Sequence, residues 1–195
     1  ETAKPLLPKR WGKLVSATAA FGHGFAVQPL QGLSVVSGIL NEGKMVPPTF
    51  MRRSKEEADV LSKQIVKKSV SANLRELFRL NATDGSAGKA DVAGYRVGGK
   101  TGTAEKVVRG RYSKDHRLAS FIGAFPMDQP RYAILVMLDE PKPLPETYGF
   151  ATSGWNAVPT AGNIIKRIAP MLGVVPHLTD ADREKLEKQR KAKKG

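Results

Sequence analysis

The chain has 195 residues, no cysteine and a formal net charge of +14 at pH 7, and 41% of its residues are apolar. This length and apolar content suit one domain with a tail and exclude a wholly disordered chain. The missing cysteines exclude disulfide bonds, thiolate metal sites and a cysteine nucleophile. No apolar run approaches the roughly 20 residues of a membrane-spanning helix.

The positive charge is spread along the chain. Residues 180–195 hold seven Lys/Arg and four Asp/Glu and therefore supply only +3 of the total. No basic motif interleaved with aromatic residues is present, so we interpret the charge as a solvated surface and predict no nucleic-acid partner. The three histidines lie far apart without metal-ligand spacing, and neither a metal nor a cofactor is predicted.

The first elements follow an irregular lead-in, residues 1–14. Pro29 suits the first turn of a helix because its missing N–H has no helical partner there. Apolar residues at helical spacing extend this helix to Leu40, and residues 41–43 (Asn-Glu-Gly) favour a left-handed stop. A second helix is predicted from about Ser69 or Ser71, with Ser71 as its cap, to a turn-rich loop at residues 81–94.

Three strands are predicted next, over residues 95–108, 118–125 and 131–138. The five-residue connection 126–130 favours a hairpin, so the second and third strands are expected to pair antiparallel. Residues 133–138 are all apolar. Since such a strand is usually covered on both faces, helices are expected on both sides of the sheet. The predicted fold class is α/β (α+β), an antiparallel sheet flanked by helices.

The last part of the chain contains a long loop, residues 141–158, with Tyr148, Phe150 and Trp155. A helix is predicted over residues 159–172. Beyond Pro176 the composition turns polar, and we expect a solvated, frayed basic tail over residues 176–195. Thr179 is able to cap a short helix there, with Asp182 three residues on.

The segment Lys100-Thr101-Gly102-Thr103 carries the chemical signal. It lies on a predicted strand, directly after two glycines. A glycine on an edge strand lets a ligand approach the backbone closely. A lysine and two threonine hydroxyls beside it suit a carboxylate and an attacked carbonyl. Lys-Thr-Gly is also the third element of the active-serine set, after Ser-x-x-Lys and Ser-x-Asn.

At this point the chain resembles a known family, the transpeptidase domain of class B penicillin-binding proteins, and the septal type in particular. The resemblance covers about residues 15–172 and depends on the order of several segments. These are Phe21 to Phe25, Pro29 to Gln31, Asn41 to Gly43, Pro47-Pro48, Tyr95 to Lys106, Ser120 to Pro126 and Arg131 to Met137. The resemblance implies residues 15–175 to be the C-terminal part of a penicillin-binding and serine β-lactamase-like transpeptidase fold.

The resemblance also implies roles for individual residues. Lys100 would set a positive field near the nucleophile, and the hydroxyls of Thr101 and Thr103 would hold the substrate carboxylate. The backbone N–H of Thr103 would be one oxyanion donor, a type of contact worth about 3–4 kcal/mol of barrier. Gly102 would permit close approach. Tyr148 or Phe150 would form an aromatic wall, although this loop departs from the family's usual Tyr-x-Gly-Gly pattern.

The nucleophile motif of the family lies upstream of all these segments and is expected to precede Glu1, in a longer chain. Ser86 and Lys89 fit Ser-x-x-Lys, and Ser71 and Asn73 fit Ser-x-Asn, but their order is reversed. Ser86 also lies in a glycine-rich loop, where a serine and a lysine are not held on one helical turn. We interpret both matches as coincidence, and predict this chain alone to be inactive.

The implied activity is cross-linking of peptidoglycan stem peptides ending in D-Ala-D-Ala during septal cell-wall synthesis, with β-lactam antibiotics trapping the same serine. The missing N-terminal half of the domain and division-complex membrane proteins are the further implied partners, and the periplasmic face of the inner membrane is the implied location. Two alternatives stay open: a serine β-lactamase-like hydrolase, and a non-catalytic basic binding module.

Overall fold

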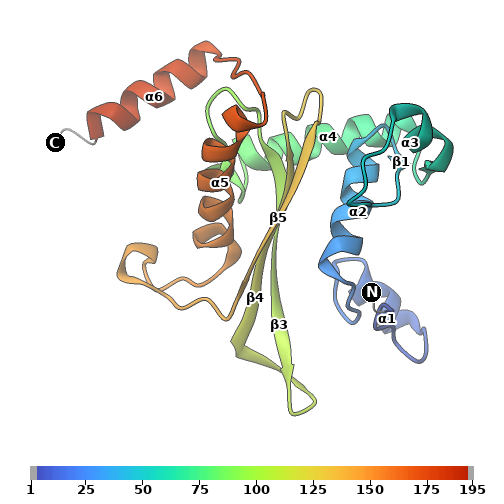
Figure 1. Ribbon diagram of the computed structural model, residues 1–195. Helices are drawn as coiled ribbons and strands as arrows, with labels where there is room; N and C mark the ends of the chain where they lie inside the picture. The colour runs from blue at the N-terminus through green and yellow to red at the C-terminus, as the bar shows by residue number, and fades with distance from the viewer. Residues whose placement is uncertain (1–3, 193–195) are drawn as a thin grey trace.

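The computed structural model describes residues 4–192, and a three-stranded antiparallel sheet lies between helices (Figure 1). The outermost residues of the predicted lead-in and tail, 1–3 and 193–195, lie outside the described residues. The helices are α1 (Lys13–Ala19), α2 (Pro29–Leu40), α3 (Lys55–Leu61), α4 (Lys68–Thr83), α5 (Ala157–Met171) and α6 (Asp180–Ala192), with short 3₁₀ turns η1 (Gly88–Ala90), η2 (Pro145–Thr147) and η3 (Ser153–Trp155). A two-stranded pair joins β1 (Lys44–Met45) to β2 (Lys63–Gln64). Within residues 4–192 no helix combines the length and apolar character that a membrane span needs.

The main sheet has the order β3-β4-β5, formed by β3 (Gly98–Val108), β4 (Arg111–Phe125) and β5 (Tyr132–Asp139). The predicted antiparallel hairpin of the second and third strands is confirmed. The second strand begins seven residues earlier than predicted, because Arg109 and Gly110 form a two-residue turn with φ of 51° and 79°. Positive φ at both central residues matches the right-handed twist of the paired strands. Because the strand order is β3-β4-β5, β3 is one edge of this sheet.

Helices pack against both faces of the sheet, as the apolar β5 predicted. On one face the buried Phe121, Phe125 and Ile165 belong to the main core, which joins β4 to α5. On the other face Leu40 of α2 and Ala124 of β4 belong to a smaller core. Alternate residues of β4 therefore face two different helical layers, and this arrangement fixes the orientation of β3 beside it.

Local signals explain most helix boundaries. Pro29 occupies the first turn of α2, as predicted, and the helix ends before Glu42 and Gly43, which have φ of 52° and 79°. α3 was not predicted, although Ser54 and Glu57 form a capping box, in which each side chain accepts a hydrogen bond from the other's backbone N–H.

The prediction that Ser71 caps the start of α4 is wrong. The helix begins at Lys68 with Lys67 in the cap position, and Ser71 lies fully buried inside the first turn. The backbone N–H of Ser71 already donates to the carbonyl of Lys67 at 3.0 Å. Ser71 therefore packs in the interior instead of capping the helix.

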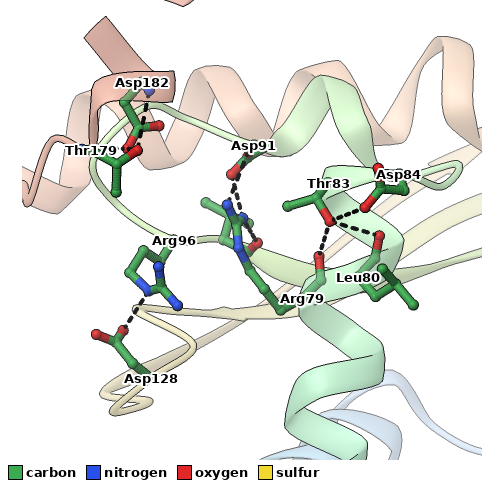
Figure 2. A network of polar contacts seen from close by, with 10 residues as sticks. Arg79, Leu80, Thr83, Asp84, Asp91, Arg96, Asp128, Thr179 and Asp182 are labelled. Carbon is green, nitrogen blue, oxygen red and sulfur yellow. Dashed lines mark hydrogen bonds and ion pairs between the residues drawn. The ribbon is translucent and has the colours of Figure 1, made fainter.

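An arginine joins α4 to the beginning of β3 (Figure 2). The guanidinium of Arg79 donates to both carboxylate oxygens of Asp91, at 2.5 and 3.4 Å, and to the carbonyl of Val97 at 2.6 Å. The side chains of Arg79 and Asp91 are only 21% and 10% exposed. Such a two-pronged, largely buried pair fixes position as well as adding energy. It sets where the chain enters β3, one residue after Val97.

The segment predicted to be a solvated, frayed tail with a short capped helix contains the 13-residue helix α6. Thr179 Oγ1 accepts a hydrogen bond from the backbone N–H of Asp182 at 3.2 Å, which confirms the predicted cap. The Asp182 carboxylate accepts in return from the backbone N–H and the hydroxyl of Thr179 (Figure 2). Burial raises the pKa of Asp182, but the hydrogen bonds from Thr179 and Gly94 outweigh it, and the pKa is lowered overall. His177 N–H also donates to the carbonyl of Gly94 at 2.9 Å. These contacts attach the start of α6 to the loop before β3.

Candidate functional site

The predicted Lys-Thr-Gly segment lies on β3, where an edge strand leaves every second N–H and C=O without a strand partner. Lys100 pairs with Ile122, and Gly102 pairs with Ser120 across the ladder. A Cβ atom at Gly102 would lie 2.7 Å from the hydroxyl oxygen of Ser120. Glycine therefore avoids this close contact and leaves the strand edge free of a side chain at this position. Thr101 and Thr103 point to the face on which α5 packs, since side chains alternate along a strand.

A cavity of about 440 Å³ lies beside these two threonines. The loop between α4 and β3 forms one wall, and the segment before α5 forms the other. The lining residues other than Thr101 and Thr103 are Gly85, Ser86, Gly88, Lys89, Thr152, Ser153, Gly154 and Trp155. The site is thus built from three segments that are far apart in sequence.

Thr103 is held by a backbone donor. The N–H of Ser153 donates to Thr103 Oγ1 at 3.1 Å, and the hydroxyl of the buried Ser153 donates in turn to the carbonyl of Ser120. Because a backbone N–H can only donate, the Thr103 oxygen acts as acceptor on this side. Its own O–H proton remains available for a ligand in the cavity.

Lys100 and Thr101 form a second polar group. Lys100 Nζ lies 2.9 Å from the carbonyl oxygen of Thr101 and 3.4 Å from Thr101 Oγ1. Ser86 Oγ lies 2.9 Å from the same hydroxyl. An exposed ammonium with two threonine hydroxyls on one edge strand is suited to binding an anion such as a carboxylate.

The aromatic residues gather around Trp155. The rings of Tyr148 and Phe150 each lie 5.6 Å from the Trp155 ring, and Lys89 Nζ lies 3.4 Å from its centre. Trp155 lines the cavity, whereas Tyr148 is 79% exposed and neither it nor Phe150 is among the lining residues. Trp155 is therefore the aromatic residue that lines the cavity next to the threonines. Tyr148 and Phe150 contact its ring, and their own role as an aromatic wall stays a prediction.

The local Ser-x-x-Lys match does not form a nucleophile pair. Ser86 lies in a turn and Lys89 in the short η1, and the Lys89 amine rests on the Trp155 ring. Ser71 of the Ser-x-Asn match is buried in α4. Among residues 4–192 no cluster of three potential metal ligands is present either.

Sequence reasoning missed three contributors: Ser86, Ser153 and Trp155. Ser86 and Trp155 were noted for other reasons, but their contacts cross 15 residues to Thr101 and 66 residues to Lys89. Only the folded chain brings them together. Ser153 carries no local signal, because its role depends on its backbone N–H.

Comparison with known proteins places these residues in a family. The family model of the penicillin binding protein transpeptidase domain matches residues 1–166. Two similar proteins are the probable peptidoglycan D,D-transpeptidase FtsI of Caulobacter vibrioides, 41% identical, and the stage V sporulation protein D of Bacillus subtilis, 34% identical. The alignments cover 89% and 90% of this chain but 31% and 28% of those proteins. The chain thus spans about a third of the length of these relatives.

Solved structures agree with the sequence match. The apo transpeptidase domain of penicillin-binding protein 3 from Burkholderia pseudomallei superposes with a TM-score of 0.76 at 28% identity, over 88% of this chain and 50% of that chain. Penicillin-binding protein 3 from Mycobacterium tuberculosis, complexed with ampicillin, gives a TM-score of 0.74 at 26% identity, over 91% of this chain and 42% of that chain. The predicted fold class is confirmed.

Proposed function

Because the chain belongs to the penicillin-binding protein transpeptidase family, we propose that it supplies the carboxylate-binding side of a peptidoglycan D,D-transpeptidase site whose serine nucleophile lies outside residues 1–195. The observation that carries the proposal is that Thr101 and Thr103 of an edge strand line a cavity, with Lys100 Nζ 3.4 Å from Thr101 Oγ1. The relatives named as D,D-transpeptidases support the reaction class.

The proposed reaction has two acyl-transfer steps. The serine oxygen attacks the carbonyl carbon of the penultimate D-alanine, the peptide bond breaks, and D-alanine leaves with a proton on its amine. An amine of a neighbouring strand then attacks the ester, releasing the serine hydroxyl and forming the cross-link. A covalent intermediate of this kind divides one difficult step into two easier ones.

Each of the site residues has a defined part in that reaction. The O–H of Thr103 and the hydroxyl of Thr101 bind the substrate carboxylate, and the ammonium of Lys100 adds positive charge next to it. The backbone N–H of Thr103 on the edge strand is one donor to the developing oxyanion. Trp155 walls the cavity, and Gly102 leaves the strand open to the ligand backbone.

A β-lactam carries a carboxylate and a strained amide and is the proposed inhibitor; the solved relatives complexed with aztreonam and ampicillin support this choice. A septal role and a location at the periplasmic face of the inner membrane, with division-complex partners, are proposed from the relative named FtsI. Neither a hydrolase nor a nucleic-acid-binding role is favoured by any contact of the described site.

Labelling with a fluorescent penicillin tests the function. In the complete gene product, Lys100→Ala is expected to slow acylation by about a hundredfold or more, because a preorganised charge is lost from the reacting centre. Lys114→Ala is the matched control, since Lys114 is an exposed lysine on β4, and it should leave labelling unchanged. Equal labelling of both variants and the wild type would reject the site.

A further inference from the structure

We propose that Ser86 is a positioning residue that directs the hydroxyl of Thr101 to donate to a bound carboxylate, an inference that rests on the proposed function. The two hydroxyl oxygens lie 2.9 Å apart, and either is able to be the donor. The direction of this one hydrogen bond decides whether Thr101 has a proton to offer a ligand. Ser86 thereby determines how strongly the Thr101 hydroxyl binds a carboxylate.

Asn81, in the last turn of α4, fixes one end of the chain of polar groups. Its Nδ2 donates to the carbonyl of Gly99 at 2.7 Å. The opposite orientation of the amide would place two oxygen acceptors against each other, so Oδ1 is the atom that faces Ser86 Oγ, 3.3 Å away. Asn81 therefore offers Ser86 an acceptor and no donor.

These contacts fix which hydroxyl donates to which acceptor when no carboxylate is bound. Ser86 donates to Asn81 Oδ1, and its oxygen accepts the proton of Thr101. In this order the Thr101 proton points inward, toward the loop. The Thr101 oxygen still has lone pairs facing Lys100 Nζ, 3.4 Å away.

A bound carboxylate reverses the order. Thr101 must then turn its proton outward to the ligand, and its oxygen needs a donor on the loop side. Rotation of the Ser86 O–H from Asn81 to Thr101 supplies that donor without movement of any heavy atom. The resulting chain, Ser86 to Thr101 to carboxylate, is also strengthened because successive hydrogen bonds polarise one another.

The two threonines of the segment are therefore not equivalent. Thr103 receives its hydrogen bond from the backbone N–H of Ser153, which has no alternative direction. It is a donor to the ligand in every state. Thr101 is a donor only when Ser86 supports it.

Ser86 is held at this place by its neighbours. Ala87 and Ala90 are fully buried, on the same side of the loop as the main core. A side chain at Gly85 would lie 2.3 Å from Asn81 Oδ1, so the turn before Ser86 packs directly against the asparagine. The 2.9 Å contact with Thr101 is thus set by a tight turn, although Ser86 itself is exposed.

A double-mutant cycle in the complete gene product tests the inference. The readout is the second-order rate constant of acylation by a penicillin with a free carboxylate. Ser86→Ala is expected to slow acylation about three- to tenfold in the wild-type background, the effect of one hydrogen bond. The same substitution combined with Thr101→Val should have no further effect, because the supported hydroxyl is gone.

Two further variants separate positioning from folding. Ser86→Thr keeps the hydroxyl and should restore wild-type acylation. Ser34→Ala removes a hydroxyl that bonds only within α2 and should change nothing. An equal slowing by Ser86→Ala in both backgrounds, or none in either, would overturn the inference. If wild-type protein fails to acylate at all, the proposed function fails instead, and labelling that survives Lys100→Ala points to the same conclusion.

Discussion

Gly99 is the residue at which the functional strand meets the core. An added Cβ there would lie 2.3 Å from Phe121 Cζ and 2.8 Å from the carbonyl of Ile122. The ring of Phe121 is fully buried, so it shifts only at the expense of its close-packed neighbours. Packing therefore requires glycine at the position before Lys100, because a side chain there would clash with Phe121 on the neighbouring strand β4.

Gly99→Ala is accordingly expected to destabilise the protein by about 1–3 kcal/mol through overpacking. Thermal unfolding of the complete gene product measures it as a lower melting temperature. Gly32→Ala in α2 is the control, because its Cβ would meet nothing within 4 Å, and it should be neutral or slightly stabilising. Equal melting temperatures for Gly99→Ala and the wild type would show that the Phe121 contact does not restrict this position.

At this scale the sequence located the candidate binding residues but not the residues that support them. Lys100, Thr101 and Thr103 are recognisable because their chemistry resides in their side chains and in a short motif. The contact of Ser153 with Thr103 uses a backbone N–H and spans 50 residues. A contact of that kind leaves no pattern in composition or spacing.

Among the elements, the loop that connects α4 to β3 determines the position of one wall of the cavity. Arg79 binds Asp91 and the carbonyl of Val97 and so ties the helix to the middle and to the far end of the loop that carries Ser86. The lining of the cavity includes four residues of this loop. The position of the loop, and with it the Ser86 contact, depends on this brace.

Arg79→Ala is expected to destabilise the complete protein by about 3 kcal/mol, because it leaves a largely buried carboxylate without this partner. It should also slow penicillin acylation. Lys68→Ala removes a comparable but exposed ion pair with Glu42, 2.8 Å long and with side chains 67% and 53% exposed. That control should cost no more than about 1 kcal/mol. Similar unfolding temperatures for the two variants would contradict the assigned role of Arg79.

Several elements were predictable and others were not. The period of the apolar residues and Pro29 located α2, and the hairpin of β4 and β5 followed from a short loop between apolar runs. α3 was missed despite its Ser54–Glu57 capping box, because the charged residues of this segment were interpreted only as part of a solvated surface. The Arg109-Gly110 turn was missed for the same reason. Charge hid two local signals that have clear structural causes.

At the scale of the whole molecule, the fold brings together three segments that no local pattern connects. β3 lies at an edge of the sheet, and the loop after α4 and the segment before α5 both pack on the face that α5 covers (Figure 1). The continuous apolar run of residues 133–138 predicted helices on both faces of the sheet, and the contacts confirm it. The packing of Trp155 and Ser153 against the strand arises only from that assembly.

In the proposed function this chain binds the substrate carboxylate while a serine outside residues 1–195 is acylated, so identifying the acylated residue tests the proposal. The complete gene product is treated with a penicillin, digested, and analysed by mass spectrometry. We expect the penicilloyl group on a serine outside residues 1–195, and no stoichiometric adduct on the 195-residue chain alone. A stoichiometric adduct on Ser86 would contradict it.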